Sequence, residues 1–360
     1  MSRPIRVSAE VRARLDAFRL PAQLAFGRHL LPIMARAVHE SGRWRNVEII
    51  PYAPLSIDPA ARVLHYAQEI FEGLKAYAVD GAAPSLFRPR DNWVRMNASA
   101  RRLCMPELDE GVFMGAIEAV VALGRSHIPL ARGASLYLRP FMIGVEASLN
   151  LGPSARHEFY VIASPSEALQ KGAFHLFVEQ EHSRAAVGGT GAVKAGANYA
   201  GAEASSGRAE AAGCNQTLWL DPVERRYVEE LSGMNLFAVI DGALVTPPLS
   251  GTLLPGVTRD SVLRLAAHLG HSAREQPLEI HELCGRIAAG TCREIFASGT
   301  AATLVPVASV RLGERLFHLA EAHPVTDRLR LALLALQEGR GDDPFGWRYP
   351  VTDVPLDVRD

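Results

Sequence analysis

The sequence predicts an α+β protein with two domains. Its 360 residues exceed the roughly 100–200 residues of a typical domain. Strand-like and helix-like segments follow one another without the regular alternation of a doubly wound nucleotide-binding fold. The pattern breaks after Pro165, and a glycine-rich stretch follows at 187–203. We therefore expect a domain at 1–170, an interdomain linker at 171–187 and a second domain at 188–360.

In the first half, aromatic and β-branched residues crowded between turn residues predict strands, and apolar residues at helical spacing predict helices. Pro54 and Pro106 each follow the end of an expected element, and Gly124 is a helix stop signal. The Arg-rich N-terminal segment is expected to be a surface helix or arm. Strands are expected at 47–52, 63–66, 135–144 and 157–165, and helices at 92–103 and 111–124.

The second half shows the same two kinds of pattern, separated by turns rich in Gly, Pro and Asp. Asp221-Pro222, the run PPLSGTLLPG and the run SGTAA are the clearest turns. Strands are expected at 174–181, 216–220, 226–228, 294–297 and around 304–310, and helices at 200–212, 234–239, 258–269 and 326–339.

Composition argues against several classes of partner. A net charge of −1 with 21% charged residues gives no reason to expect binding to nucleic acid or to an anionic membrane. No apolar run approaches the roughly 18 residues that span a bilayer. The four cysteines form no C-x-x-C pair, so neither a zinc site nor a disulfide framework is expected. Glu10 and Asp16 interrupt the Arg-rich N-terminal segment, which argues against a transit peptide. We expect a cytoplasmic protein with reduced thiols and no metal.

One lysine lies in the glycine-rich stretch VGGTGAVKAGANYAGAE. A P-loop needs Gly directly before its Lys and Ser or Thr directly after it, whereas Val193 precedes Lys194 and Ala195 follows it. The dinucleotide pattern G-x-G-x-x-G also fails, since the glycines fall at 188, 189, 191 and 196. Neither phosphate-binding loop is therefore predicted here.

Two interpretations of Lys194 remain open from the residues alone. It is either a solvated lysine of a surface loop or a lysine that forms a Schiff base with a carbonyl compound. The neighbours Ala192, Val193, Ala195 and Ala197 are small and apolar. Partial desolvation by such neighbours lowers the pKa of an ammonium group and favours the neutral, nucleophilic amine.

Several collinear segments of the chain resemble one family, the branched-chain amino acid aminotransferases. This family belongs to the fold-type IV group of pyridoxal 5′-phosphate (PLP) enzymes, the class IV aminotransferases. The resemblance extends over almost the full length after about residue 25. The segments are LHYAQEIFEGLKAY (64–77), FRPRDNWVRMNASARRL (87–103), LYLRPFMIG (136–144), the segment 194–237 that begins KAGANYAGAE, PPLSGTLLPGVTRDSVLRLA (247–266), EIFASGTAATLVPV (294–307) and GRGDDPFGW (339–347).

The resemblance implies a two-domain fold like that of D-amino acid aminotransferase. The domain at 1–170 is then the smaller α/β domain, and 188–360 is the larger PLP-binding domain that carries the Schiff-base lysine. The cofactor and the active site are expected at the domain interface. The implied reaction moves the amino group of a branched-chain or related aliphatic L-amino acid to 2-oxoglutarate in two ping-pong half-reactions. Lys194 is implied as both covalent anchor and proton shuttle.

The resemblance also assigns the residues that bind the cofactor. Glu230 corresponds to the carboxylate beside the pyridine nitrogen, which stabilises a carbanion by keeping that nitrogen protonated. Glu229 is the competitor, but neighbouring side chains of a strand point to opposite faces, and the distance from Met234-Asn235 favours Glu230. Tyr199 corresponds to the partner of the phenolic oxygen, and Leu254 to the residue against the ring.

The phosphate of the cofactor needs a positive charge and hydrogen-bond donors. Arg95 corresponds to the phosphate-binding arginine of the family, whereas Arg88 and Arg90 are expected to be solvated. The amides of Gly256, Val257 and Thr258 precede a predicted helix, and a helix N-terminus suits an anion. The turn 298–301, with the Thr300 hydroxyl, offers a second set of donors.

Substrate contacts are also implied by the resemblance. Tyr66 and the amides of Thr300 and Ala301 are expected to hold the α-carboxylate. Phe71, Tyr137 and Arg139 are expected to line the pocket, with Arg139 helping to accept the distal carboxylate of glutamate without leaving an unpaired buried charge. In the family a loop of a second subunit completes the pocket, here near 149–151, so a homodimer is implied.

Four segments depart from the family pattern. Pro32, Ile33 and Met34 replace an Asp-His-Met run, SEALQ at 166–170 lacks the usual Gly and aromatic residues, and Gly233 stands where Thr is usual. Ala302 and Val305 replace a redox C-x-x-C pair. The first three lie on the substrate side of the family, and they favour a preference shifted away from Leu, Ile and Val.

Two rival functions follow from other classes. Another fold-type IV enzyme, such as a D-amino acid aminotransferase or aminodeoxychorismate lyase, is expected to be shorter and to lack the FEGLKAY and LYLRP segments. A non-catalytic PLP-binding or scaffold protein is expected to lose Lys194 or Glu230, and both are present. An enzyme of shifted specificity in a specialised pathway remains the alternative closest to the main expectation.

Overall fold

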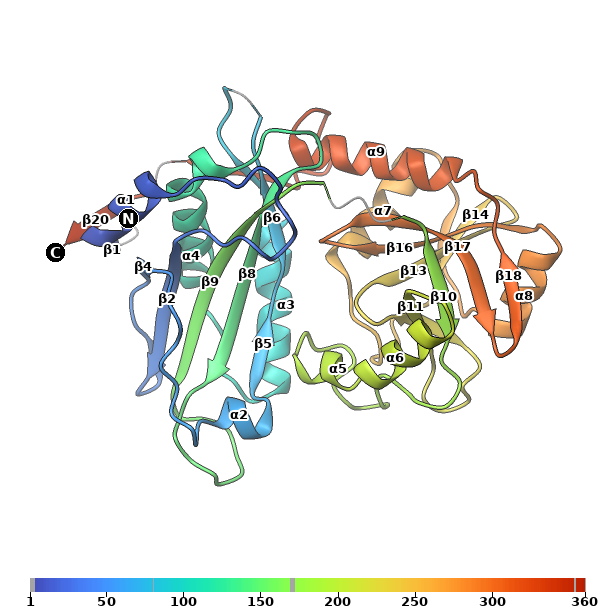
Figure 1. Ribbon diagram of the computed structural model, residues 1–360, viewed down its shortest axis with the longest axis horizontal. Helices are drawn as coiled ribbons and strands as arrows, with labels where there is room; N and C mark the ends of the chain where they lie inside the picture. The colour runs from blue at the N-terminus through green and yellow to red at the C-terminus, as the bar shows by residue number, and fades with distance from the viewer. Residues whose placement is uncertain (1–3, 80, 169–171, 353, 360) are drawn as a thin grey trace. The chain divides into compact units, whose positions relative to one another are not determined.

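The computed structural model describes residues 4–79, 81–168, 172–352 and 354–359 (Figure 1). The chain divides into two units. Unit 1 consists of Met1–Leu169, Lys194–Gly196 and Ala335–Asp360, and unit 2 consists of Gln170–Val193 and Ala197–Leu334. No helix within the described ranges has the length and apolar character needed to cross a membrane.

These units differ from the domains expected from the sequence in three segments. The segment expected as a linker, 171–187, of which 171 lies outside the described residues, belongs to unit 2. Lys194–Gly196 and Ala335–Asp360 group with unit 1, although both fall within the expected second domain. The division into a smaller domain, a linker and a larger PLP-binding domain stays a prediction.

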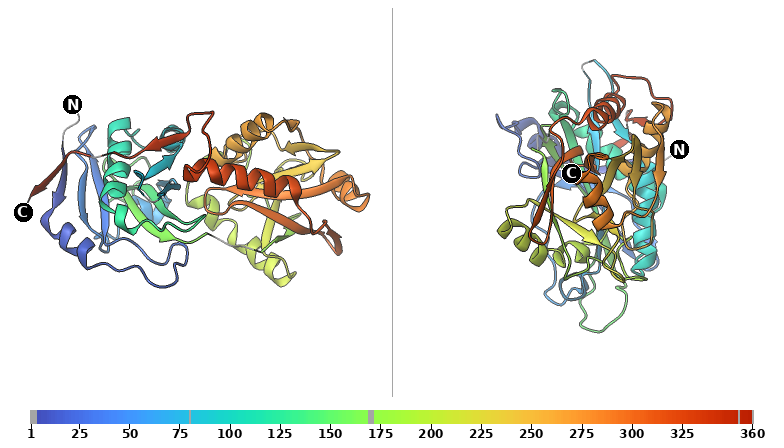
Figure 2. Two further views of the ribbon diagram at one scale, coloured as in Figure 1. Left: turned by 90° about the horizontal axis from the view of Figure 1, so that it is seen from above. Right: turned by 90° about the vertical axis from the view of Figure 1, so that its right-hand side faces the viewer.

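Unit 1 is built on one mixed sheet. Among the described residues the sheet has 11 strands, and the terminal strands β1 and β20 pair in parallel, so that they lie side by side (Figure 1, Figure 2). In order across the sheet the strands are β19 (Arg348–Pro350), β7 (Ser85–Phe87), β6 (Leu74–Tyr77), β8 (Ser135–Gly144), β9 (His157–Ser166), β2 (Ile33–Glu40), β4 (Glu48–Pro51), β1 (Ile5–Ser8) and β20 (Leu356–Arg359), with β3 (Arg43–Trp44) beside β2 and β5 (Glu69–Phe71) beside β8.

Two long helices accompany this sheet. In α4 (Glu110–Leu123), Phe113, Ile117, Val120 and Val121 are fully buried, and the helix packs against β2 and β9. This spacing of three to four residues places the apolar side chains on one face. The neighbouring helix α3 (Pro89–Arg102) packs against α4 and against β5. The N-terminal helix α1 (Ala9–Ala17) confirms the helix expected there.

The expectation of a strand at 63–66 is wrong. These residues lie in the short helix α2 (Arg62–Tyr66), which ends at Ala67 in the left-handed conformation. Four residues show no periodicity that separates a strand from one turn of helix. Arg62, which is buried and forms an ion pair with Glu146, ties the helix to the segment that follows β8.

Unit 2 contains a second sheet, of nine strands among the described residues. Its path runs from β12 to β15, and an additional pairing of β12 with β13 closes six of the strands into a ring. In order the strands are β12 (Val228–Leu231), β11 (Gln216–Leu220), β10 (Phe174–Val178), β17 (Thr303–Leu312), β16 (Cys292–Gly299), β13 (Asn235–Ile240), β14 (Ala243–Thr246) and β15 (Ala273–Glu275), with β18 (Arg315–His318) beside β17.

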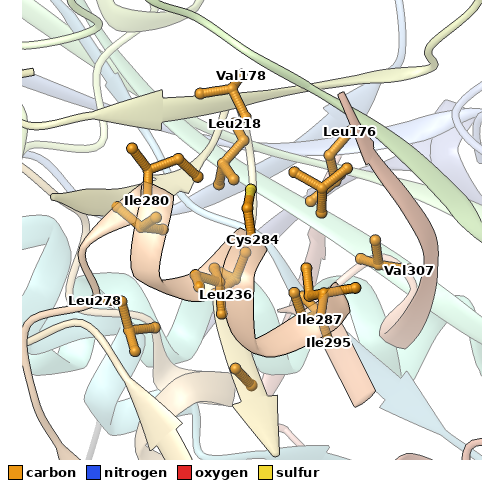
Figure 3. Close-up of a cluster of buried hydrophobic side chains, with 14 of the residues drawn as sticks. Leu176, Val178, Leu218, Leu236, Leu278, Ile280, Cys284, Ile287, Ile295 and Val307 are labelled. Atoms are coloured by element: carbon orange, nitrogen blue, oxygen red, sulfur yellow. The ribbon is translucent and has the colours of Figure 1, made fainter. Parts of the chain in front are cut away.

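The core of unit 2 joins a helix to the ring of strands (Figure 3). In α8 (Ile280–Ala288), Ile280, Cys284 and Ile287 are buried at helical spacing. They belong to one cluster with Leu236 of β13 and Val307 of β17. The other helices are α5 (Ala197–Ala200), α6 (Glu203–Ala211), α7 (Val257–His268) and α9 (Pro324–Glu338), which continues from unit 2 into unit 1.

The expectation of a helix at 234–239 is also wrong. The segment forms β13, whose six residues are all buried, and it pairs with β14 and β16 on its two sides. A continuous apolar run buried on both faces carries no period that distinguishes strand from helix. The turn Asp241–Gly242, with φ values of 50° and 80°, supplies the tight hairpin that a strand requires. The other expected helices and strands are present with shifted ends.

Candidate active site

Lys194 is held in unit 1 through its backbone. The Phe71 amide donates to Lys194 O at 3.0 Å, and the Lys194 amide donates to Ser99 Oγ at 3.1 Å. The next glycine is fixed as well, because the Gly196 amide donates to Glu69 Oε2 at 2.7 Å. Lys194 itself is half-buried. The segment that carries the lysine is therefore fastened to β5 and α3.

The Phe71 ring lies between two cations. Lys194 Nζ is 4.6 Å from the centre of the ring, and Arg139 Cζ is 4.7 Å from it. Arg139 Nη2 also donates to Tyr137 Oη at 3.0 Å. A cation near the face of an aromatic ring is attracted by the negative charge of that face. Four residues that the sequence assigned to catalysis and substrate binding, Lys194, Phe71, Tyr137 and Arg139, thus form one cluster.

Two neighbours of this cluster were missed from the sequence. Phe26 packs edge-to-face against Tyr137, with ring centres 4.7 Å apart. A Cβ at Gly73 would lie 2.2 Å from Tyr137 Oη, so the tyrosine needs a glycine there. Burial raises the pKa of Glu69, opposed by its hydrogen bond with the Gly196 amide and by the charges of Arg139 and Lys194. The signal for Gly73 was present in the FEG motif, whereas nothing marked Phe26.

Arg95 takes part in a buried ion pair on α3. Its Nε and Nη2 donate to the two oxygens of Glu72 at 2.7 and 2.8 Å, and Glu72 is 0% exposed. Asn92 Nδ2 donates to Glu72 at 2.8 Å. Burial raises the pKa of Glu72, but the Arg95 guanidinium and the hydrogen bonds outweigh it, so the net pKa lies below its ordinary value. Glu72 was not singled out from the sequence.

The expectation that Arg88 is solvated is wrong. Arg88 is buried, forms an ion pair with Asp91 and lies over the ring of Trp347. The aromatic ring and the carboxylate supply the contacts that water would otherwise make. Arg90 is exposed, as expected, and pairs with Glu110.

Tyr66 lies apart from the buried residues of unit 1. It ends α2, is 41% exposed, and its hydroxyl donates to Leu149 O. Leu149 and Leu151 are 63% and 85% exposed. The loop expected to take part in subunit contact therefore presents apolar side chains to solvent and is linked to Tyr66 within the same chain.

In unit 2, Glu230 is a buried carboxylate with several donors. Oε2 accepts from Asn235 Nδ2 at 2.8 Å, and Oε1 accepts from the Leu254 amide at 3.1 Å. The Leu254 carbonyl in turn accepts from Asn235. The preceding Glu229 is also buried and accepts from Thr252 Oγ1. Burial raises the pKa of Glu229.

Arg184 completes the surroundings of Glu230 and was missed from the sequence. Its Nη2 lies 2.7 Å from Glu230 Oε1, and both side chains are 5% exposed. The same atom donates to the carbonyls of Gly191 and Thr252. The available signal was the position of this arginine in EHSRAAVGG, just before the glycine-rich stretch.

The donors expected for a phosphate group lie at the start of α7 and after β16. Gly256 is the N-cap of α7, and Val257 and Thr258 form its first turn. A Cβ at Gly256 would lie 2.1 Å from Asn235 Oδ1, and Asn235 pairs with Ser298 across β13 and β16. The turn of Thr300 and Ala301 directly follows β16. The helix N-terminus is thus next to the strand end that leads into this turn.

Two further observations concern the character of the unit 2 residues. The hydroxyl of Ser298 is buried without a hydrogen-bond partner among the described residues. Tyr199, on α5, lies beside Gly233, where an added Cβ would be 3.8 Å from Tyr199 Cε1. Within the described ranges no group of His, Cys, Asp or Glu could hold a metal ion.

Of the departures from the family pattern, Pro32 precedes β2, and Ile33 and Met34 are buried in its first positions. Ser166 ends β9, whereas 169 and 170 lie outside the described residues.

Comparison with known proteins gives a consistent result. The family model "Amino-transferase class IV" matches residues 69–310. The branched-chain-amino-acid aminotransferase of Mycobacterium tuberculosis (strain H37Rv) is 45% identical over 334 residues, covering 89% of this chain and 90% of the relative. That of Mycolicibacterium smegmatis is 43% identical over 355 residues, covering 95% and 96%.

Solved structures show the same relationship and confirm the predicted fold class. The branched-chain amino acid aminotransferase from Escherichia coli superimposes with a TM-score of 0.72 at 29% identity, covering 89% of this chain and 100% of that one. A branched-chain amino acid aminotransferase of T.th., complexed with N-(5′-phosphopyridoxyl)-L-glutamate, gives a TM-score of 0.72 at 30% identity, covering 88% and 98%. The chain belongs to the class IV aminotransferase family.

Proposed function

We propose that this enzyme binds PLP and moves the amino group of a branched-chain L-amino acid to 2-oxoglutarate. The observation that carries the proposal is the cluster of Lys194 and Arg139 on the two sides of the Phe71 ring. A reactive amine and a second cation beside one apolar surface suit a substrate that has an aliphatic side chain in one half-reaction and a carboxylate in the other. The relatives in the comparison have this activity by name.

The residues of the chain fit PLP in charge and donor type. Arg95, the first-turn amides of Val257 and Thr258, and Thr300 suit a phosphate dianion, since a helix N-terminus and an arginine both stabilise negative charge. Glu230 is a buried carboxylate that suits a protonated ring nitrogen. Tyr199 suits the phenolic oxygen, and Leu254 the face of the ring. A protein of the same family was solved with pyridoxamine 5′-phosphate.

When bound, PLP withdraws electrons from the substrate Cα and so stabilises the carbanion that forms there. The side chains of this protein do the rest. Lys194 anchors the cofactor and, once released by the incoming amino acid, carries the proton from Cα. Glu230 holds the proton on the ring nitrogen.

The substrate is positioned by a separate group of residues. Tyr66 and the amides of Thr300 and Ala301 orient the α-carboxylate. Phe71 presents its ring to an aliphatic side chain, whereas Arg139, held by Tyr137, receives the distal carboxylate of glutamate. The same pocket can therefore accept both substrates without leaving a buried charge unpaired.

The test is a steady-state assay of the purified protein with PLP. We expect 2-oxoglutarate-dependent conversion of L-Leu, L-Ile and L-Val, and a visible absorption band of the bound cofactor. Lys194→Ala should lose both the band and the conversion, whereas Lys75→Ala is the matched control, since Lys75 is buried elsewhere in unit 1. Absence of the band in the unaltered protein, or conversion of D-amino acids alone, would contradict the proposal.

A second candidate, a preference shifted to other aliphatic or aromatic amino acids, is favoured by Gly233. An added Cβ there would meet Tyr199 only at 3.8 Å, so a side chain usual in the family would fit, and glycine leaves space instead. Rates with a panel of L-amino acids test this candidate. Equal preference of the unaltered protein and Gly233→Thr would remove it.

We also propose that the protein works as a homodimer in the cytoplasm. The apolar loop residues Leu149 and Leu151 are exposed, and a partly buried apolar cluster surrounds Met34 and Tyr160 on the sheet of unit 1. An exposed apolar surface of this kind is typical of a subunit contact. The cysteines are free, as in a reducing compartment. Light scattering should give twice the mass of 39.0 kDa, and a monomer that remains active would contradict the dimer.

A further inference from the structure

Arg184 makes contacts that the proposed reaction has not yet used. Its Nη2 lies 2.7 Å from Glu230 Oε1 and donates to Gly191 O at 3.3 Å and to Thr252 O. A single guanidinium therefore reaches the proposed ring-nitrogen carboxylate, the glycine-rich segment that leads to Lys194, and the turn before α7. All of the residues that it contacts belong to unit 2.

The packing around these contacts leaves little freedom. A Cβ at Gly191 would lie 2.2 Å from Thr252 O and 2.7 Å from Ala185 Cβ. The two backbone segments therefore touch at the point where Arg184 donates to both. A planar, always charged guanidinium suits such a point, because its several donors have fixed directions, whereas a lysine ammonium is a single flexible point charge.

The charge of Arg184 also matters for Glu230. Burial disfavours a charged carboxylate, and an adjacent cation favours it. Glu229, on the same strand and equally buried, shows the first effect, since burial raises its pKa. Glu230 has the guanidinium at 2.7 Å. A carboxyl group must be ionised to hold a proton on a pyridine nitrogen.

We propose that Arg184 is a positioning residue for the transfer reaction: its guanidinium keeps Glu230 ionised and in place, and fastens the segment before Lys194 to that carboxylate. This inference rests on the proposed function. It assigns Arg184 no contact with the substrate or the cofactor. Arg184 acts through Glu230 on the proton transfer at Cα, and through Gly191 on the approach to the lysine.

The test compares Arg184→Gln and Arg184→Lys with Arg259→Gln. Arg259 is the matched control, because it is also 5% exposed, is paired with Glu275 and donates to a carbonyl, that of Pro247. The measurements are kcat at saturating PLP and L-leucine, the kinetic isotope effect with L-leucine deuterated at Cα, and the PLP dissociation constant of the apoprotein from its visible absorption.

We expect Arg184→Gln to lower kcat about ten- to hundredfold, as a misplaced catalytic group does, and to raise the isotope effect, since proton removal from Cα becomes slower. The PLP dissociation constant should rise as well. Arg184→Lys, which keeps the charge but cannot direct donors to three acceptors, should lie between Arg184→Gln and the unaltered protein. Arg259→Gln should change thermal stability and leave kcat and the isotope effect unaltered.

An isotope effect in Arg184→Gln equal to that in Arg259→Gln would overturn the inference. If Arg184→Gln does not fold, Arg184→Lys decides: an unchanged isotope effect and PLP dissociation constant would overturn it equally. The outcomes separate the two proposals. Failure of the unaltered protein to bind PLP or to transfer an amino group contradicts the proposed function, whereas an active unaltered protein with insensitive Arg184 variants contradicts this inference alone.

Discussion

His157, a buried histidine of β9, should make unit 1 sensitive to acid. It is 2% exposed, and neither ring nitrogen has a hydrogen-bond partner among the described residues. Its cross-strand neighbour is His39, with ring centres 6.2 Å apart. Burial lowers the pKa of His157 from 6.5 to about 4, the charge of His39 adds to this, and the charge of Glu146 opposes it.

The sign follows from the direction of the shift. The unfolded chain binds a proton at this site below pH 6.5, whereas the folded protein binds it only below about pH 4. Between these values the unfolded state holds more protons, so the free energy of unfolding decreases as the pH falls. A shift of 2.5 units (6.5 − 4), at 1.36 kcal/mol per unit, corresponds to about 3 kcal/mol. This contribution is complete above pH 6.5 and is lost by pH 4.

Urea unfolding of the unaltered protein and of His157→Leu, measured from pH 7.5 to 4, isolates this contribution, because all other groups are common to both. The stability difference between the two proteins should change by about 3 kcal/mol over this range, in favour of His157→Leu at low pH. His281→Gln, at an exposed position of α8, is the control and should follow the unaltered protein. Parallel curves for the unaltered protein and His157→Leu would refute the reasoning.

Three further predictions concern the buried contacts of the candidate site. Glu72→Gln leaves the Arg95 charge buried without its partner and should lower the free energy of unfolding by about 3–5 kcal/mol, measured with urea; a loss below about 1 kcal/mol would contradict it. Gly191→Ala places a Cβ 2.2 Å from Thr252 O and should destabilise by about 1–3 kcal/mol, whereas Gly207→Ala, in α6 with open space around it, should stabilise by about 1 kcal/mol; thermal unfolding compares them. Glu230→Gln should lower kcat at least about tenfold, and Glu229→Gln should leave it close to that of the unaltered protein; equal losses would count against the assignment of Glu230.

Long periodic segments were predictable because burial on one face leaves a repeat in the sequence. The helices α4 and α7 and the strands β8 and β9 lie where the sequence placed them. α2 was too short to show any repeat. β13 is buried on all sides, which removes the alternation that marks a strand.

The candidate site shows a different limit. Residues in motifs, such as Lys194 and Arg95, could be picked out by resemblance. Glu72 and Arg184 were missed although both are buried and charged, because their roles depend on partners distant along the chain. Arg184 lies 46 positions from Glu230 (230 − 184), and no local pattern records that pairing.

The discontinuity of unit 1 has a consequence for the order in which the protein is made. Its sheet includes β19 (Arg348–Pro350) and β20 (Leu356–Arg359) at its two edges, so it cannot be completed until synthesis of the chain is nearly finished. All strands of unit 2 lie between β10 and β18, and that unit is finished earlier. Since domains fold as units during synthesis, unit 2 should become resistant to protease on the ribosome while unit 1 still awaits its last strands.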